Sequence, residues 1–422
     1  MADLQGRVTD KEKTGGACFR PAEMSMDREM TGQSSGFVAP GYQPVAEAFA
    51  DILATYGGGA AACVYLDGVA VLDLWGGLAD VGTGRAWSAD TLTVVFSCTK
   101  GLMSLLAARL VEAGQLDYDA PVAQYWPDYA AAGKQETLVR HLLSHQAGLS
   151  APAIPLGVDD IVDWDRMVGL LGAQVPLWPP GTGHSYHFIT HGWLVGEVLR
   201  RATGKSAGRL LDEMIAQPLV ASTWIGLPAS ERARVAHIGV GASFADGTDA
   251  FLRDSSEWIE HGLTLRGALP TTLASPGAGF NDPRLWAAEI PGAGGIADAR
   301  SLARIWSAAV TQTGGVAPLR DDTIGRATMP QSSGAPVFHE PEPWMRWGMG
   351  FQIDSPARRY LTSRGFGHDG AGGQVTFAEP ALGLSFAFIT NQMEESDPRA
   401  LSLVEALRGV PEIRNRIAVT VS

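Results

Sequence analysis

A serine and a lysine stand three residues apart where a β-rich run gives way to a helical pattern. Ser97 and Lys100 follow the run Thr91–Phe96 and precede the apolar-periodic stretch Leu102–Val111. Residues three apart on a first helical turn share a face, so the amine can reach the hydroxyl. The positive potential at a helix N-terminus favours an alkoxide and disfavours a protonated lysine. The pair predicts a serine nucleophile with a neutral amine as its base, whereas the alternative is an N-cap serine beside a solvated lysine.

A tyrosine in a turn-rich loop is a second candidate for proton transfer. The segment Pro180–His187 contains three turn-forming residues and runs into a helix expected to begin near Thr190, which places Tyr186 beside a helix start. A phenol can shuttle protons when a neighbouring cation lowers its pKa, and Lys100 is a candidate for that cation. The alternative is a buried tyrosine with one satisfied hydrogen bond.

A glycine-rich stretch later in the chain is a candidate for contact with a ligand. Gly367–Gly373 contains His368 and Gly370, and glycines let backbone N–H groups approach a ligand closely. Trp344 and Trp347 precede this stretch and are candidates for lining a pocket, although most tryptophans are core residues.

Three histidines within eight residues raise the question of a metal. His184, His187 and His191 are close in sequence, and the last two could share a helix face. No carboxylate or cysteine stands at a matching spacing, so we expect no metal site.

The elements that must position these residues fall into two groups. We expect a helix over 43–56, a hairpin of strands 61–66 and 69–74, helical patterns through the middle, late strands over 348–353, 374–378 and 384–391, and a helix after Pro398. Strands at both ends with helices between them predict an α/β (α+β) protein, an antiparallel sheet flanked by helices with an inserted, mostly helical lobe. The predicted divisions are a poorly ordered lead-in (1–38), an α/β lobe (39–95 with 290–422) and a helical lobe (96–289).

Composition narrows the partners and the compartment. The net charge of −13 has no basic block, which disfavours nucleic acid and anionic membranes as partners. The three cysteines are scattered and suit a reducing compartment. The N-terminus lacks an apolar run of signal-peptide length, and no later stretch of about 18 apolar residues could span a membrane. We therefore expect a cytoplasmic protein with a small-molecule substrate, and its oligomeric state is left open.

These segments, taken in order, resemble the class C β-lactamase and penicillin-binding-protein superfamily, and among its branches the family VIII carboxylesterases. The likeness includes Arg140–Leu149 and Gly292–Arg304 and extends from about residue 40 to 410. It implies a β-lactamase-like fold and an acyl-enzyme on Ser97 that Lys100 and Tyr186 activate. It also implies an oxyanion hole made by the N–H groups of Ser97 and Ala371, with no metal or organic cofactor.

Two departures from that superfamily bear on the substrate. Phe188 stands where β-lactamases have an asparagine that holds the acylamide group, and His368 begins the motif that is Lys-(Ser/Thr)-Gly in penicillin-recognising relatives. Both changes remove polar handles for a β-lactam, so a simple ester is the expected substrate, with β-lactam turnover as a weak side activity. His368 either tunes Tyr186 and Lys100 or lines the pocket.

Three other functions stay open on the sequence. An acyltransferase would use the same acyl-enzyme with another acceptor, and a D-amino-acid peptidase or amidase is less favoured because no lysine is dedicated to a substrate carboxylate. The non-enzymatic alternative is a β-lactam-sensing or ligand-binding scaffold that acylates without turnover.

Overall fold

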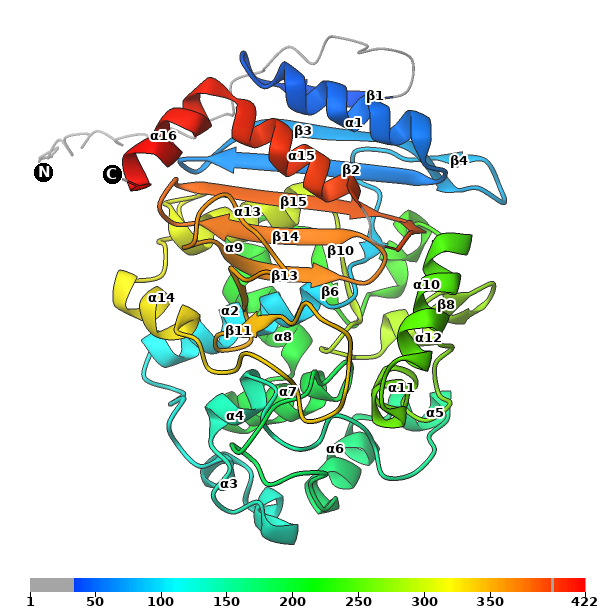
Figure 1. The fold of residues 1–422 in the computed structure, drawn as a ribbon, viewed down its shortest axis with the longest axis vertical. Coiled ribbons are helices and arrows are strands. Elements are labelled where there is room, and N and C mark those ends of the chain that lie inside the picture. Colours follow the sequence, from blue (N-terminus) through cyan, green and yellow to red (C-terminus); the bar gives the residue numbers. More distant parts are fainter. Residues whose placement is uncertain (1–33, 396–397, 422) are drawn as a thin grey trace, which may run out of the picture.

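The computed structural model describes residues 34–395 and 398–421, and its centre is an antiparallel sheet built from both ends of the chain (Figure 1). The strand order is β1-β3-β2-β15-β14-β13-β12-β11, and β4 pairs with β3. The N-terminal and C-terminal parts of the sheet meet where β2 pairs with β15. The strands are β1 (Ser34–Val38), β2 (Gly59–Leu66), β3 (Val69–Asp80), β4 (Arg85–Ala86), β11 (Arg346–Trp347), β12 (Gln352–Ile353), β13 (Phe366–Gly370), β14 (Gln374–Glu379) and β15 (Leu384–Thr390).

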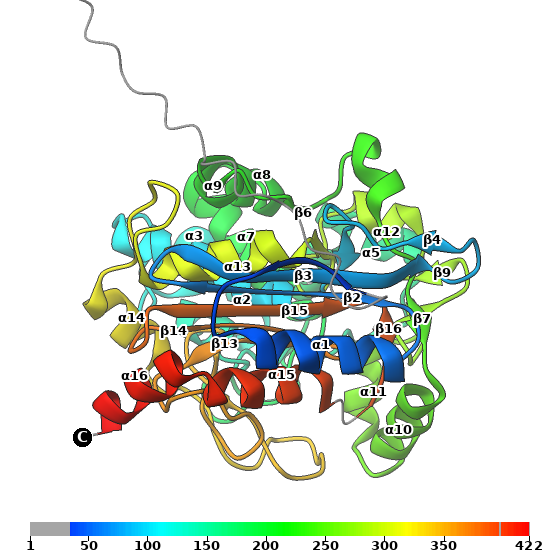
Figure 2. The same ribbon diagram turned by 90° about the horizontal axis from the view of Figure 1, so that it is seen from above.

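Helices cover both faces of this sheet because its central strands are apolar on both sides. Val64 and Phe386 belong to the core under one layer of helices, while their neighbours Cys63 and Ala387 belong to the core on the opposite face. Figure 2 shows α1, α15 and α16 on one face and α13 on the other. These helices are α1 (Gln43–Thr55), α13 (Ala299–Val310), α15 (Pro398–Gly409) and α16 (Pro411–Val421).

The middle of the chain is mainly helical and lies below the sheet in Figure 1. Its first helix, α2, packs against both β13 and α7, so residues at the ends of these three elements converge. The α-helices outside the sheet layers are α2 (Cys98–Glu112), α3 (Val122–Tyr125), α4 (Val139–Leu143), α5 (Val158–Ile161), α6 (Trp164–Ala173), α7 (Thr190–Thr203), α8 (Ala207–Leu211), α9 (Gln217–Leu219), α10 (Ala242–Arg253), α11 (Glu257–Thr264), α12 (Pro283–Ala287) and α14 (Asp321–Thr328). The short strands are β5 (Thr93–Val94), β6 (Thr223–Ile225), β7 (Gly239–Val240), β8 (Ala274–Ser275), β9 (Ala278–Gly279), β10 (Gly295–Ala297) and β16 (Gln392–Met393).

The predicted antiparallel sheet flanked by helices is confirmed, together with both hairpins. Three expectations about individual elements need correction. Residues 34–38 of the expected lead-in form β1, which pairs with β3 at the edge of the sheet. Only Gln352–Ile353 (β12) of the expected strand 348–353 is strand, because residues 348–351 form the turn from β11, where Gly350 has a φ of +81°. The first four residues of the glycine motif, Gly367–Gly370, belong to the strand β13, and the rest form the turn into β14.

Two expectations about the chain's organisation remain predictions. Residues 1–33 are not among the described residues, and the two-lobe division at residues 96 and 290 stays a prediction. In the described part of the chain, no helix is both long and apolar enough to cross a lipid bilayer.

Candidate active site

Ser97 stands at the tip of α2, where the chain turns sharply out of β5. Strand β5 is held by pairing with β10, and beyond it Val95 donates its N–H to the carbonyl of Gly295 at 2.8 Å. Phe96 then takes a positive φ of 45°, which is strained for a non-glycine residue. This turn leaves Ser97 at the N-cap of α2, half-buried and lining a cavity.

Lys100 forms hydrogen bonds with the serine and with two backbone carbonyls near it. Its Nζ lies 2.9 Å from Ser97 Oγ, and it donates to the carbonyl oxygens of Phe188 at 2.5 Å and Gly292 at 2.7 Å. A neutral amine has two N–H groups and one lone pair. The two carbonyls take both N–H groups, so the lone pair of a neutral Lys100 faces the Ser97 hydroxyl.

The electrostatics favour that neutral amine. The Lys100 side chain is fully buried, and burial holds its pKa well below the usual range for lysine. Its polar partners are two carbonyl oxygens and a hydroxyl, and no carboxylate among the described residues is paired with it. The geometry therefore suits a lysine that accepts a proton from Ser97.

Tyr186 reaches the same serine from the loop before α7. Its phenol interacts with the Ser97 side chain, and its ring centroid lies 4.8 Å from Lys100 Nζ. The expectation that Lys100 lowers the pKa of Tyr186 is wrong, because burial raises the phenol pKa above its ordinary value and a neutral lysine supplies no positive charge. Tyr186 is therefore a neutral proton donor and acceptor at physiological pH.

Aromatic rings on several sides fix the orientation of Tyr186. Trp347 is stacked on it, with ring centroids 5.1 Å apart and an angle of 13° between the planes, and Phe188 meets its ring edge-on at 4.8 Å. His145 lies 4.7 Å from it and also packs against Trp347 at 4.5 Å. The tyrosine is thereby held toward Ser97 by packing.

His145 and His187 position the Tyr186 loop through the backbone. His145 Nδ1 accepts a hydrogen bond from the backbone N–H of His187 at 3.2 Å. The His187 ring donates from Nδ1 to the Ser185 carbonyl at 2.7 Å and accepts at Nε2 from the N–H of Leu149 at 3.2 Å. Both nitrogens of His187 are thus engaged in holding backbone, which is a structural role within the histidine cluster.

The glycine-rich segment Gly367–Gly373 contributes backbone groups to the site rather than side chains. His368 is fully buried and is not among the residues that line the cavity beside Ser97, although its ring lies 6.3 Å from that of Tyr186. Gly370 comes so close to the chain just beyond β5 that a Cβ there would stand 2.4 Å from the Val95 carbonyl. This approach brings Ala371, which does line the cavity, to the side of β5 that leads into Ser97.

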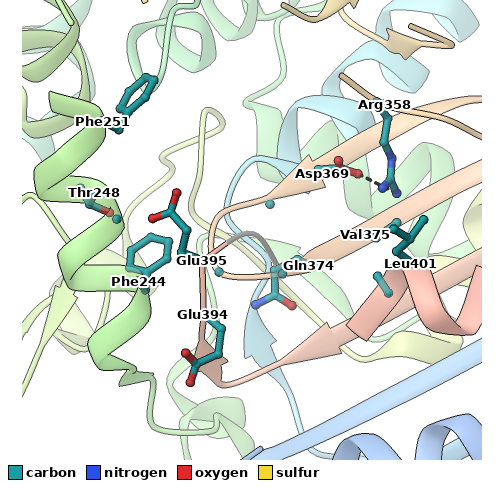
Figure 3. Close-up of a pocket in the computed structure, with 15 residues that line it drawn as sticks. Phe244, Thr248, Phe251, Arg358, Asp369, Gln374, Val375, Glu394, Glu395 and Leu401 are labelled. Carbon is teal, nitrogen blue, oxygen red and sulfur yellow. Dashed lines mark ion pairs between the residues drawn. The ribbon is translucent and has the colours of Figure 1, made fainter. Parts of the chain in front are cut away.

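The cavity beside Ser97 has a volume of about 390 Å³, and seven aromatic side chains contribute to its walls. The predicted pocket residues Phe188, Trp344 and Trp347 all line it. A second cavity adjoins it and shares part of the α10 wall, including Phe244, Thr248 and Phe251 (Figure 3). The aromatic residues of the first cavity are Phe96, Tyr186, Phe188, Phe244, Phe251, Trp344 and Trp347.

Sequence reasoning missed the carbonyls that hold Lys100, the histidine beneath Tyr186, and a carboxyl group in the cavity. Backbone carbonyls carry no residue signature, so neither Phe188 nor Gly292 could be identified as a partner of the lysine. His145 lies in the segment 140–149 that carried the resemblance, which was the available signal. Glu340 had no signal beyond its place in a proline-rich run.

Comparisons with known proteins agree with this geometry. Residues 46–408 match the protein family described as Beta-lactamase. Esterase/beta-lactamase LipL of Mycobacterium tuberculosis is 34% identical over 367 residues, which is 85% of this chain and 83% of that protein. A crystal structure of a family VIII carboxylesterase superposes with a TM-score of 0.78 at 34% identity, covering 88% of this chain and 98% of that one. A penicillin-binding protein homologue from Caulobacter crescentus has a TM-score of 0.77 at 33% identity, covering 89% and 99%.

Proposed function

The chain belongs to the beta-lactamase family, and we propose that it is a carboxylesterase that cleaves esters through an acyl-enzyme on Ser97. The observation that carries the proposal is the hydrogen-bond inventory of Lys100, whose two N–H groups are committed to carbonyls while its lone pair faces the serine. Relatives with esterase names support ester hydrolysis as the reaction.

Acylation begins with transfer of the Ser97 proton to Lys100. The serine oxygen then attacks the ester carbonyl and forms a tetrahedral intermediate. Collapse of the intermediate breaks the bond to the alcohol, which leaves with a proton from Tyr186, while the phenol regains a proton from Lys100. The step leaves an ester between Ser97 and the acyl group, with both proton carriers neutral again.

The developing oxyanion needs fixed donors, and we assign them to the N–H groups of Ser97 and Ala371. The resemblance to the family supports this assignment. The close approach of Gly370 to the Val95 carbonyl supports it as well, because it holds the end of β13 against the turn that carries Ser97. Two fixed donors of this kind commonly lower a barrier by roughly 3 kcal/mol or more.

Deacylation reverses the proton path with water in place of the alcohol. Tyr186 and Lys100 accept the proton of a water molecule that attacks the acyl carbon, and Ser97 leaves as the hydroxyl. No residue beyond those used in acylation is needed for this step.

A simple ester suits the cavity better than a β-lactam. Phe188 lines the cavity with an aromatic ring packed edge-on to Tyr186, which offers no hydrogen bond to an acylamide group. We therefore propose β-lactam turnover as a minor activity at most.

Purified protein with p-nitrophenyl butyrate and nitrocefin tests the function. We expect steady multiple turnover of the ester, a nitrocefin rate at least about a hundredfold lower, and loss of both in Ser97→Ala. Intact-mass analysis of the wild type quenched during turnover should show one added butyryl group. Digestion of the same sample should locate that group on the peptide that contains Ser97. Full ester turnover by Ser97→Ala would overturn the proposal, and a stoichiometric burst without turnover would favour a sensor.

We also propose a cytosolic location. Cys63 and Cys98 are buried free thiols, which is the usual state of cysteines in a reducing compartment. Cell fractionation followed by immunodetection of the native protein tests this placement.

A further inference from the structure

The cavity beside Ser97 contains a carboxyl group that the mechanism does not use. Glu340 lines this cavity, and no described residue forms a hydrogen bond or ion pair with its carboxylate. Burial alone raises the pKa of Glu340 to about 7, so the group is ionised in mildly alkaline solution. A carboxylate in an aromatic cavity without a partner is costly unless a ligand supplies one.

The other titratable groups of the cavity wall are neutral or already balanced. Burial lowers the pKa of His184 and raises that of Tyr186, so both are uncharged near pH 8. Asp369 is paired with Arg358, whose guanidinium lies 3.1 Å from the carboxylate (Figure 3). Glu340 is therefore the unbalanced charge among the described residues that line this cavity.

The loop that carries Glu340 is fixed on both flanks. Val337 donates its N–H to the carbonyl of His184 at 2.7 Å, and the carbonyl of His339 accepts from the N–H of Ser256 at 2.9 Å. On the other side, the indole N–H of Trp344 donates to the Glu340 carbonyl at 3.1 Å.

The ring of Phe338 adds to this anchoring from below the loop. It is stacked on Trp258, with centroids 5.9 Å apart, and meets Trp178 edge-on at 5.5 Å. The backbone of Glu340 is thus anchored in place before any ligand binds.

Aromatic walls around one carboxylate form a site suited to a positive charge. Ring faces attract cations within about 6 Å, and quaternary ammonium groups are recognised in this way by proteins with aromatic cages. The same charge repels an anion, so the cavity discriminates by the sign of the ligand.

We propose that Glu340 is a specificity-determining residue that selects esters bearing a cationic, ammonium-type group over neutral and anionic esters of the same size. The inference rests on the proposed ester hydrolysis at Ser97. The neighbouring cavity reinforces the negative field, because Glu394 and Glu395 lie on its side next to α10 (Figure 3). Glu394 is engaged there with Ser243 and Gln392.

The test compares esters that differ in charge and match in shape at pH 8. On the acyl side the probes are p-nitrophenyl esters of 4-(trimethylammonio)butanoic acid, of 5,5-dimethylhexanoic acid as its neutral isostere, and of glutaric acid as the anionic member. On the alcohol side they are butyrylcholine and 3,3-dimethylbutyl butyrate. The readout is the ratio of kcat/KM for the cationic and neutral members, which cancels a general loss of activity.

In the wild type we expect a ratio of about ten or more in at least one series, and a glutarate rate about tenfold below the neutral ester. Glu340→Gln should bring the ratio to within about twofold of unity. Glu342→Gln is the matched control, since Glu342 is an exposed residue of the same loop, and it should retain the wild-type ratio.

Several results would overturn the inference while leaving ester hydrolysis intact. These are a wild-type ratio near unity in both series, a ratio that Glu340→Gln leaves unchanged, and a ratio that is lost equally in Glu342→Gln or only in Glu395→Gln. If Glu340→Gln fails to fold, the order of the wild-type kcat/KM values for the cationic, neutral and anionic esters still tests the inference. A higher kcat/KM for the anionic ester than for the cationic ester would refute it. Absence of hydrolysis of every ester would overturn the proposed function and this inference together.

Discussion

The indole of Trp347 lies parallel to the phenol ring of Tyr186, with ring centroids 5.1 Å apart and 13° between their planes. Because an aromatic pair of this kind contributes roughly 0.5–1.5 kcal/mol, we expect Trp347→Leu to lower kcat by about three- to tenfold. Trp347 also lines the cavity, so KM for a large ester should rise as well.

Trp347→Phe serves as the control for stacking, because it keeps a ring against Tyr186 and should recover most of kcat. Steady-state kinetics with p-nitrophenyl acetate separates the two effects, since so small an ester depends little on the cavity wall. Equal kcat in Trp347→Leu and the wild type would show that the stack does not position the phenol.

Removing the proton carriers should reduce turnover while leaving the fold in place. We expect Lys100→Met and Tyr186→Phe each to lower kcat/KM by about 10²–10⁴, the usual contribution of a positioned acid or base. Lys134→Met is a matched control, because Lys134 is another fully buried lysine whose amine donates to two carbonyls, those of Ala131 and Gln174. That control should lose stability but keep kcat/KM per folded molecule, as measured by active-site titration.

The sequence allowed prediction of the parts of this site that depend on local spacing. Ser97 and Lys100 are one helical turn apart, so their proximity follows from a single helix. Tyr186 reaches them only through the packing of α2 against α7, and a resemblance to a family was needed to connect it with the pair. The sheet and its two hairpins followed from β-rich apolar runs separated by turn residues, which is a local signal as well.

The remaining features depend on tertiary contacts that leave no local pattern. The segment of β1 has few apolar residues and pairs only at the edge of the sheet, so its composition resembles a loop. The carbonyls of Phe188 and Gly292 become partners of Lys100 through loops that are far apart in sequence. Glu340 enters the cavity only because its loop is anchored at both flanks.

The pH profile should report the neutral lysine. A protonated Lys100 cannot accept the serine proton, so kcat/KM falls as pH falls through the pKa of the folded enzyme, which burial places well below the usual lysine range. Burial raises the pKa of Tyr186, so its ionisation removes no activity in mildly alkaline solution. We expect a plateau of kcat/KM for a neutral ester between about pH 8 and pH 10. An activity that rises steadily through pH 10 would indicate an ordinary lysine and contradict the assignment.

Acid should destabilise the protein through its buried histidines. Burial lowers the pKa of His187 and of His368 to about 3, whereas the unfolded chain titrates near 6.5. Between these values the unfolded state binds more protons than the folded state, so the free energy of unfolding decreases as pH falls. From pH 7 to pH 5 each histidine should remove roughly 2 kcal/mol.

Denaturant titrations at pH 7 and pH 5 measure this loss. His187→Gln should reduce the pH dependence by the contribution of one histidine, even though it lowers stability at both pH values. His339→Gln, which replaces an exposed histidine, is the control for exchanging histidine for glutamine as such. Identical pH dependence in His187→Gln and the wild type would mean that His187 binds protons equally in the folded and unfolded states, contrary to the expectation.

The loop whose Gly292 carbonyl accepts a hydrogen bond from Lys100 packs closely against α7, and this contact should require glycine at both Gly192 and Gly292. A Cβ at Gly192 would stand 2.0 Å from the backbone nitrogen of Gly292, and one at Gly292 would stand 2.2 Å from the carbonyl of Ile189. Both obstacles are backbone atoms, so the loop must move away when Gly192 becomes alanine. Because the Gly292 carbonyl accepts from Lys100 at 2.7 Å, that movement frees an N–H of the amine and displaces it from Ser97.

We therefore expect Gly192→Ala to lower kcat by at least about tenfold and to destabilise the fold by roughly 1–3 kcal/mol. Gly169→Ala is the matched control, because Gly169 is an exposed position within α6 where a Cβ has nothing within 4 Å. That change should leave activity intact and raise stability by up to about 1 kcal/mol, since alanine favours helix. The two variants add the same methyl group to a helix. A loss of activity confined to Gly192→Ala would therefore place the effect in the contact with Gly292. Equal activity in both variants would show that the spacing between Gly192 and Gly292 does not control the position of Lys100.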